Sequence, residues 1–196
     1  MIGDYFNRKA TIWDETSSER DSTRLERMAK RLEIKPGSAM LDVGTGTGVF
    51  VPFLLRELGE DGRIVALDLA AKMLGCACTK DFNGDINYLC ADVASIPLNS
   101  EIFDAVVCHS CFPHFQDKLR ALVEINRVLK GGGRLLICHT SSRARINEIH
   151  SQIPVVANDI IPDEGNMREL LQRAGFTEIK IDDDGGSYLV SVRKPE

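Results

Sequence analysis

Apolar residues along this chain form two kinds of pattern, short continuous runs and longer stretches in which they recur at helical spacing. A short continuous run predicts a strand that is buried on both faces of a sheet, whereas the helical spacing predicts an amphipathic helix. The strands expected on this basis are 39–43, 63–67, 86–90, 103–109 and 134–138. The helices expected are 21–33, 50–58, 70–80, 117–129, 145–151 and 164–174.

The predicted strands alternate with the predicted helices, and a pair of strands closes the chain. Residues 176–181 and 188–193 form that pair, joined by an acidic, glycine-containing turn over 182–186. Strands separated by helices favour a parallel sheet with right-handed crossovers and helices on both faces. The fold class expected is therefore α/β, with a Rossmann-like, doubly wound sheet.

The first strand ends in three glycines at alternate positions, Gly44, Gly46 and Gly48, and a helix follows. Glycine permits positive φ angles and a close approach of a ligand, and the first amides of a helix point N–H groups at that ligand. The turn therefore predicts a nucleotide-like cofactor. The dinucleotide fingerprint is G-x-G-x-x-G, whereas this turn is G-x-G-x-G and follows Asp42. Because a carboxylate there would repel phosphate, the pattern favours a cationic cofactor, S-adenosylmethionine.

The stretch 41–50 resembles the first signature motif of class I S-adenosylmethionine-dependent methyltransferases, and the resemblance continues downstream. An acid about 20 residues beyond such a turn, here Asp68, is placed to accept both ribose hydroxyls. Residues 91–93 resemble the motif that binds adenine, and 103–106 and 130–133 resemble two further motifs of the family. The cofactor-binding residues expected from the turn and from the resemblance are Asp42, Gly44, Thr45, Gly46, Gly48, Asp68, Leu69, Met73, Asp92, Val93, Cys108 and His109.

The resemblance extends to quinone-methylating and other C- or O-methylating enzymes of this class, and it implies several properties. It implies a seven-stranded, mostly parallel sheet whose last strand is antiparallel, methyl transfer as the reaction, and a small-molecule acceptor. The chain is then expected to form one domain over 1–196. Within it, 1–37 would be a helical lid, 38–138 the cofactor-binding core, and 139–196 an acceptor-side cap with the C-terminal strands.

Three aromatic residues in the first segment bear on the lid. Tyr5, Phe6 and Trp13 lie in a stretch without a strong period. In the family that the sequence resembles, a segment of this kind folds over the cofactor. An N-terminal arm that docks its aromatic side chains on the surface is an equal alternative.

The catalytic candidates are the four histidines, His109, His114, His139 and His150, which all follow the fourth or fifth strand. Methyl transfer from a sulfonium is an in-line displacement, so the protein has to align the acceptor and remove its proton if the acceptor is acidic. A neutral imidazole suits that proton transfer. His109 and His139 are the favoured pair because they stand at the ends of strands expected to be neighbours. Each histidine could instead make only local hydrogen bonds.

The six cysteines predict no metal site and no disulfide framework, because a chain of this length builds its own core. Residues 108–111 have C-x-x-C spacing, but a structural zinc site commonly needs four ligands, and a redox pair needs a helix N-terminus. Cys111, His114 and His139 stay open as an alternative ligand set. The cysteines expected to fill the core are Cys90, Cys108 and Cys138.

Composition narrows the possible partners. The 196-residue chain has 43% hydrophobic and 27% charged residues and a net charge of −5, with no basic stripe, so nucleic acid is not an expected partner. It has neither an apolar run of membrane-spanning length nor the apolar core of a signal peptide, so a cytoplasmic protein is expected. Arg143 and Arg145 could hold a carboxylate or phosphate of the acceptor.

Two other functions are alternatives to methyl transfer. One is a non-catalytic relative that binds an adenosyl ligand. The other is an NAD-dependent oxidoreductase, for which the Tyr-x-x-x-Lys pair, Tyr5 and Lys9, stands before the first strand and so in the wrong place.

Overall fold

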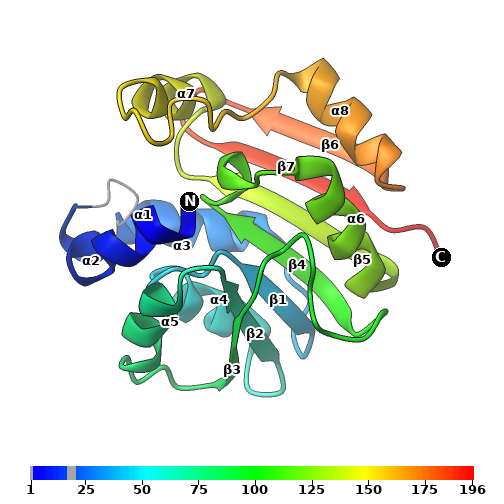
Figure 1. Ribbon diagram of the computed structural model, residues 1–196. Coiled ribbons are helices and arrows are strands. Elements are labelled where there is room, and N and C mark those ends of the chain that lie inside the picture. Colours follow the sequence, from blue (N-terminus) through cyan, green and yellow to red (C-terminus); the bar gives the residue numbers. More distant parts are fainter. Residues whose placement is uncertain (1, 17–20) are drawn as a thin grey trace.

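The computed structural model describes residues 2–16 and 21–196, which form a seven-stranded sheet with helices packed on it (Figure 1). The helical elements are α1 (Ile2–Lys9), η1 (Ala10–Ile12), α2 (Trp13–Thr16), α3 (Ser22–Arg31), α4 (Val51–Leu58), α5 (Ala71–Cys78), η2 (Phe112–His114), α6 (Lys118–Val128), α7 (Arg143–Ser151) and α8 (Glu164–Arg173). The strands are β1 (Ala39–Val43), β2 (Arg63–Asp68), β3 (Asp85–Cys90), β4 (Phe103–His109), β5 (Leu129–His139), β6 (Thr177–Asp183) and β7 (Tyr188–Arg193).

The strand order is β3-β2-β1-β4-β5-β7-β6. Strands β1 to β5 pair in parallel, and β7 runs antiparallel to both of its neighbours, β5 and β6. This arrangement confirms the expected fold class, including the antiparallel last strand. Because the strand order reverses between β1 and β4, the carboxyl ends of these strands open a crevice of the kind in which doubly wound sheets bind ligands.

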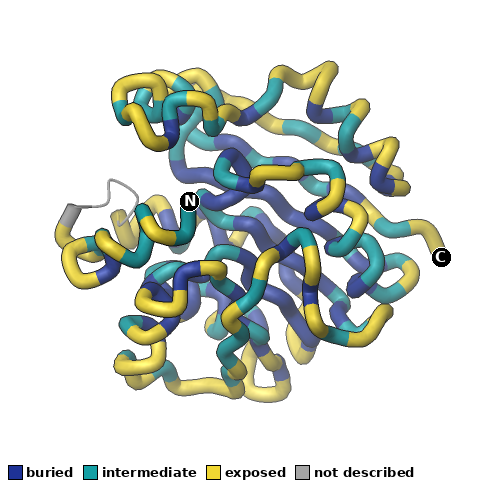
Figure 2. The backbone as a smooth tube through the Cα atoms, in the orientation of Figure 1, coloured by how far each residue is buried: buried dark blue, intermediate teal, exposed yellow. Residues whose placement is uncertain are grey.

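The core consists of two apolar layers, one on each face of the sheet. Alternate residues of one strand enter different layers, so that Leu41 lies in one and Met40 in the other. Helices α6 and α8 cover the first layer, and α3 and α4 cover the second. Figure 2 shows the buried residues concentrated along the central strands. The continuous apolar runs of the sequence arise from this burial on both faces.

Short polar side chains determine where several helices begin. The carboxylates of Asp21, Asp117 and Asp163 each accept a backbone N–H of the first turn of α3, α6 and α8. The hydroxyl of Ser142 does the same for α7, which therefore begins at Arg143, two residues before the predicted start. These caps satisfy amides that have no acceptor inside the helix.

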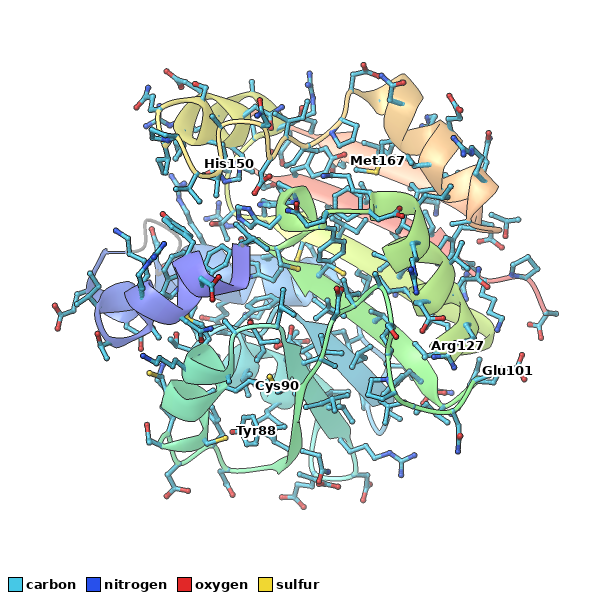
Figure 3. The ribbon with its side chains drawn as sticks, in the orientation of Figure 1. Tyr88, Cys90, Glu101, Arg127, His150 and Met167 are labelled. Atoms are coloured by element: carbon cyan, nitrogen blue, oxygen red, sulfur yellow. The ribbon has the colours of Figure 1, made fainter. Side chains whose placement is uncertain are left out.

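The structure differs from the sequence-based expectations at two strands. The glycine run 131–133 lies inside β5, which begins at Leu129 and not at Arg134, because Gly132 and Gly133 exchange backbone hydrogen bonds with Lys194. Cys90 is exposed, so its expected place in the core is wrong; it ends β3, which forms the edge of the sheet (Figure 3).

The N-terminal segment, which has no clear period in the sequence, is helical over α1, η1 and α2. Residues 1 and 17–20 of the expected lid range 1–37 lie outside the described residues. Among the residues that are described, no helix is long and apolar enough to cross a membrane.

Candidate functional site

A cavity of about 340 Å³ lies at the carboxyl ends of β1, β2 and β4, beside the N-terminal helices. Its wall includes predicted cofactor residues from the ends of four strands, β1 to β4, and side chains from the first segment of the chain. The wall residues of most interest are Ile2, Gly3, Phe6, Trp13, Asp42, Gly44, Thr45, Gly46, Phe50, Asp68, Leu69, Met73, Asp92, Val93, His109, Ser110, Cys111, His114 and Phe115. The topology therefore brings residues that are far apart in the sequence to one site.

The glycine turn brings backbone, without side chains, to the cavity. Gly44 has a φ of +67°, and its amide donates to the carbonyl of Leu67 at 2.7 Å. A Cβ on Gly44 would lie 2.4 Å from the Cβ of Cys111, so glycine is required here on two counts. The Cys111 thiol donates to the carbonyl of Val43 at 3.0 Å, which holds the residue against the turn.

Asp42 is a buried carboxylate beside this turn. Burial, and secondarily the negative charge of Asp68, raise the pKa of Asp42 to about 7. Its Oδ2 atom is buried and has no hydrogen-bond partner among the described residues. Because a buried acceptor without a partner is costly, this atom fits a ligand that brings a cation or a hydrogen-bond donor.

Asp68 links the glycine turn to the start of α5. Its Oδ2 accepts the Gly46 N–H and its Oδ1 accepts the Ala70 N–H, each at 2.8 Å. Burial raises the pKa of Asp68, and these two hydrogen bonds oppose that shift. The two hydrogen bonds hold the carboxylate in one orientation. Because each oxygen keeps a second lone pair, the carboxylate can still accept hydrogen bonds from the hydroxyls of a ligand.

The cavity wall also contains apolar side chains and a third acid, Asp92. Leu69 belongs to the wall with 47% of its surface exposed, and Met73, also in the wall, is buried. Asp92 also lines the wall and accepts the Ala94 N–H at 2.8 Å, which fixes the loop after β3. Val93 lines the same part of the wall. An aromatic base between apolar side chains and a fixed acid is a physically sensible occupant of this region.

Two predicted cofactor residues, Gly48 and Cys108, are outside the wall that the described residues form. Gly48 faces the ring of Phe82, and the Cys108 side chain enters the layer under α6, because it alternates with His109 along β4. Gly48 and Cys108 thus occupy packing positions in this structure, and their contact with the cofactor stays a prediction.

The four histidines divide into two pairs. His109 and His114 line the cavity, whereas His139 and His150 are not in the wall formed by the described residues. His139 is 2% exposed, because β7 pairs beside the end of β5 and places Tyr188 against it. His109 therefore lines the cavity without its expected partner His139, and the role of the two as a reactive pair stays a prediction.

His109 is held flat in the wall. Its ring stacks on Phe50 with centroids 4.3 Å apart and planes at 28°. Ser110, in the left-handed region with a φ of +56°, places its hydroxyl 3.4 Å from Nε2 of His109. The imidazole thus offers a ring face and a polar edge at the cavity.

His114 is held by a carboxylate that the sequence patterns did not single out. Its Nδ1 lies 2.8 Å from Oδ2 of Asp159, in the stretch between α7 and α8. Burial lowers the pKa of His114, and the nearby His150 and His139 lower it further. The hydrogen bond to Asp159 opposes this shift. Phe6 of α1 packs edge-on against the His114 ring, with centroids 5.1 Å apart.

The first segment is attached to the glycine turn and to α5. The Thr47 hydroxyl donates to the Asp14 carboxylate, which also accepts the Lys80 ammonium at 2.6 Å. The side chain of Asn7 accepts the backbone N–H of Lys72 at 2.9 Å. These contacts hold α1 and α2 against the mouth of the cavity.

The two candidate anion-binding arginines are engaged elsewhere. Arg143 lies 3.8 Å from Asp183, and Arg145 lies 2.7 Å from Glu148. Neither belongs to the cavity wall that the described residues form, so their expected contact with the acceptor is not supported. Across the described part of the chain, no cluster of three or more His, Cys, Asp or Glu side chains could hold a metal ion.

Comparison with known proteins agrees with this site. A family model described as "Methyltransferase domain" matches residues 41–137. The ubiquinone/menaquinone biosynthesis C-methyltransferase UbiE of Vibrio parahaemolyticus is 28% identical over 91% of this chain and 81% of its own. The demethylmenaquinone methyltransferase of Staphylococcus saprophyticus is 27% identical over 84% of this chain and 81% of its own.

Solved structures share the fold. The crystal structure of an S-adenosylmethionine-dependent methyltransferase from Aquifex aeolicus superposes with a TM-score of 0.72 at 23% identity, covering 97% of this chain and 96% of that one. The matched residues 41–137 contain the glycine turn, Asp68 and Asp92, which are the residues that the structure brings to the cavity. The family model, the relatives and the shared fold together support a class I S-adenosylmethionine-dependent methyltransferase.

Proposed function

We propose that this enzyme methylates a small, planar acceptor that carries an acidic hydroxyl, and that His114 is the base that removes the proton. One observation carries the proposal: a single cavity contains the carboxylates of Asp42 and Asp68 and also the imidazoles of His109 and His114. A cofactor bound near the carboxylates and an acceptor bound near the imidazoles would share this space.

In this proposal the cofactor half of the cavity binds S-adenosylmethionine, which supplies an electrophilic methyl group when bound. Asp68, oriented by two backbone amides, accepts the ribose hydroxyls. Asp42, whose Oδ2 has no partner among the described residues, faces the cationic part of the cofactor. Leu69, Met73 and Asp92 hold the adenine, the first two by apolar contact and the acid by accepting a hydrogen bond.

The cavity wall contains several aromatic rings. Phe6, Trp13, Phe50, His109 and Phe115 all belong to it, and stacked or edge-on contacts with such rings favour a flat ligand. One relative is named for ubiquinone and menaquinone biosynthesis and the other for demethylmenaquinone, and a hydroquinone is a flat ring with acidic hydroxyls. A net charge of −5 gives no support to nucleic acid as the acceptor.

His114 is preferred as the base for three reasons. It lines the cavity, its burial lowers its pKa and so favours the neutral form, and its Nδ1 is occupied by Asp159. Nε2 is then the nitrogen with a lone pair. Proton removal from the acceptor hydroxyl increases the electron density of the nucleophile as the methyl group is transferred.

The proposal also assigns a role to each of three segments of the chain. The segment 1–37 acts as the lid, 38–138 as the cofactor core, and 139–196 as the acceptor-side cap. The lid assignment is supported by Phe6 and Trp13, which line the cavity and pack on one another with centroids 5.5 Å apart. It is also supported by the contact between Asp14 and Thr47 of the glycine turn.

The first test measures cofactor binding and then turnover. Calorimetric titration should show binding of S-adenosylmethionine and S-adenosylhomocysteine, and no binding of NAD. With methyl-labelled cofactor and a soluble naphthohydroquinone as acceptor, His114→Gln should lower kcat about 100-fold or more while affinity for the cofactor stays as in the parent. His109→Gln should mainly raise the KM for the acceptor. A His114→Gln enzyme with the kcat of the parent would exclude this base.

A further inference from the structure

The segment between α7 and α8 is irregular, yet its backbone is anchored by side chains. The amide of Asn147 on α7 reaches the backbone of Ile161, accepting its N–H at 2.8 Å and donating to its carbonyl at 3.0 Å. At the start of the segment, Ile153 donates its N–H to the carbonyl of His150 at 2.9 Å. Because both ends are tied to α7, the residues between them have a defined position.

Asp159 lies in this anchored segment and contacts two histidines with two different groups. Its carboxylate lies 2.8 Å from Nδ1 of His114, and its backbone carbonyl accepts Nδ1–H of His150. The side chains of Asp159 and His114 are only 17% and 14% exposed, so water and salt screen the pair weakly. One residue therefore fixes the orientation of both rings.

The tautomer of each ring follows from its partner. A carboxylate and a carbonyl oxygen accept hydrogen bonds, so the neutral imidazoles of His114 and His150 carry their proton on Nδ1. The lone pair is then on Nε2, the atom on the side of the ring away from Asp159. His114 lines the cavity, so in its case the lone pair is available to an acceptor there.

His150 and Phe6 restrict the ring of His114 from two directions. The His150 ring lies at a centroid distance of 4.9 Å and a tilt of 35°, and Phe6 packs edge-on at 5.1 Å. His150 is on α7 (Figure 3). Its hydrogen bond to the Asp159 carbonyl keeps it in this position.

We propose that Asp159 and His150 are positioning residues for methyl transfer, and that they act through His114: Asp159 fixes its tautomer and orientation, and His150 supports its ring. This inference rests on the proposed base role of His114. It also assigns a function to the segment 152–162, namely to carry the Asp159 carboxylate to a histidine 45 positions earlier in the chain.

The charged and titratable groups around His114 determine the expected pH dependence. Asp159 raises the pKa of His114, whereas burial and the imidazoles of His150, on α7, and His139, at the end of β5, lower it. Lys118 on α6 faces the Asp159 charge. Of the groups named here, only Asp159 favours the protonated imidazole of His114. Replacing Asp159 by asparagine removes that contribution, so the pKa of His114 should fall further.

The test compares Asp159→Asn with Asp163→Asn, which removes the same charge four residues away. Asp163 caps α8 through Asn166, and asparagine caps helices equally well, so this control should leave activity unchanged. Asp159→Asn should lower kcat about 10- to 100-fold with cofactor affinity preserved. It should also move the acid limb of the kcat/KM profile to lower pH. Asp159→Glu, which keeps the charge but displaces it, should lower kcat and keep the acid limb near that of the parent.

Two further measurements separate this inference from the proposed function. In a His114→Gln background, Asp159→Asn should cause no additional loss of kcat. Nitrogen NMR of histidine-labelled protein without acceptor should show His114 protonated on Nδ1 in the parent and a mixture of tautomers in Asp159→Asn. Absence of methyl transfer by the parent would contradict the proposed function, whereas the NMR result would still decide the role of Asp159. An unchanged tautomer and an unchanged acid limb in Asp159→Asn would overturn the inference.

Discussion

Gly44→Ala should destabilise the protein more than Gly46→Ala, although both glycines belong to the same turn. Both have left-handed φ angles, +67° at Gly44 and +58° at Gly46. The surroundings differ. A Cβ on Gly46 would meet nothing nearer than the Gly44 carbonyl oxygen at 4.0 Å, whereas a Cβ on Gly44 would lie 2.4 Å from the Cβ and 2.9 Å from the Sγ of Cys111.

The expected losses in the free energy of unfolding come from two contributions, the left-handed backbone and the contact with Cys111. An alanine in the left-handed region costs about 1–2 kcal/mol, which both variants share. Overpacking adds about 1–3 kcal/mol at Gly44, because Cys111 is buried and its thiol is hydrogen-bonded to Val43, so it cannot move aside freely. Expected losses in the free energy of unfolding are therefore about 1–2 kcal/mol for Gly46→Ala and about 2–5 kcal/mol for Gly44→Ala.

Urea denaturation of the ligand-free protein measures both losses, and the difference between them isolates the contact with Cys111. Cys111→Gly, combined with Gly44→Ala, removes the colliding atoms. The double variant should therefore lose less free energy of unfolding than the sum of the losses of the two single variants. Equal destabilisation by Gly44→Ala and Gly46→Ala, or strict additivity in the cycle, would refute the reasoning.

Two further predictions concern the cofactor. Because a cationic ligand favours ionised Asp42, affinity for S-adenosylmethionine should rise with pH toward about 7 and level off above it, and calorimetry should find this dependence lost in Asp42→Asn; a flat profile in the parent would contradict it. Asp14→Ala removes the contacts of the first segment with Thr47 and Lys80, so stopped-flow measurements should show cofactor release faster by up to about fivefold. Glu15→Ala, an exposed neighbour, is the control and should release the cofactor at the parent rate.

Local patterns predicted most of the sheet and the cofactor. The bounds 39–43, 103–109 and 188–193 are those of β1, β4 and β7, because strands buried in a sheet carry a strong apolar signal. The expected fold class, S-adenosylmethionine as the cofactor and methyl transfer as the reaction are confirmed. The roles of individual site residues, and the division into lid, core and cap, stay predictions.

The acceptor side was predicted less well, for a physical reason. The sequence favours His109 and His139 because both stand at strand ends, yet His139 is buried against Tyr188 and is not in the cavity wall that the described residues form. Asp159 was not predicted, since it lies in a stretch without a period, and its partner His114 is 45 positions away. The predicted strand 134–138 omits the glycine run of β5, because the backbone partner of that run, Lys194, is also remote in the sequence.

The sequence by itself determined the order of strands and helices, the glycine turn, and the acids Asp42, Asp68 and Asp92, which lie at or just after strand ends. These features depend on residues close together in the chain, whose side-chain periodicity and backbone freedom act locally. Only the tertiary structure decided which side chains meet across the crevice. Packing of β7 beside β5, and of the 152–162 segment against η2, buried one histidine and gave another a carboxylate partner.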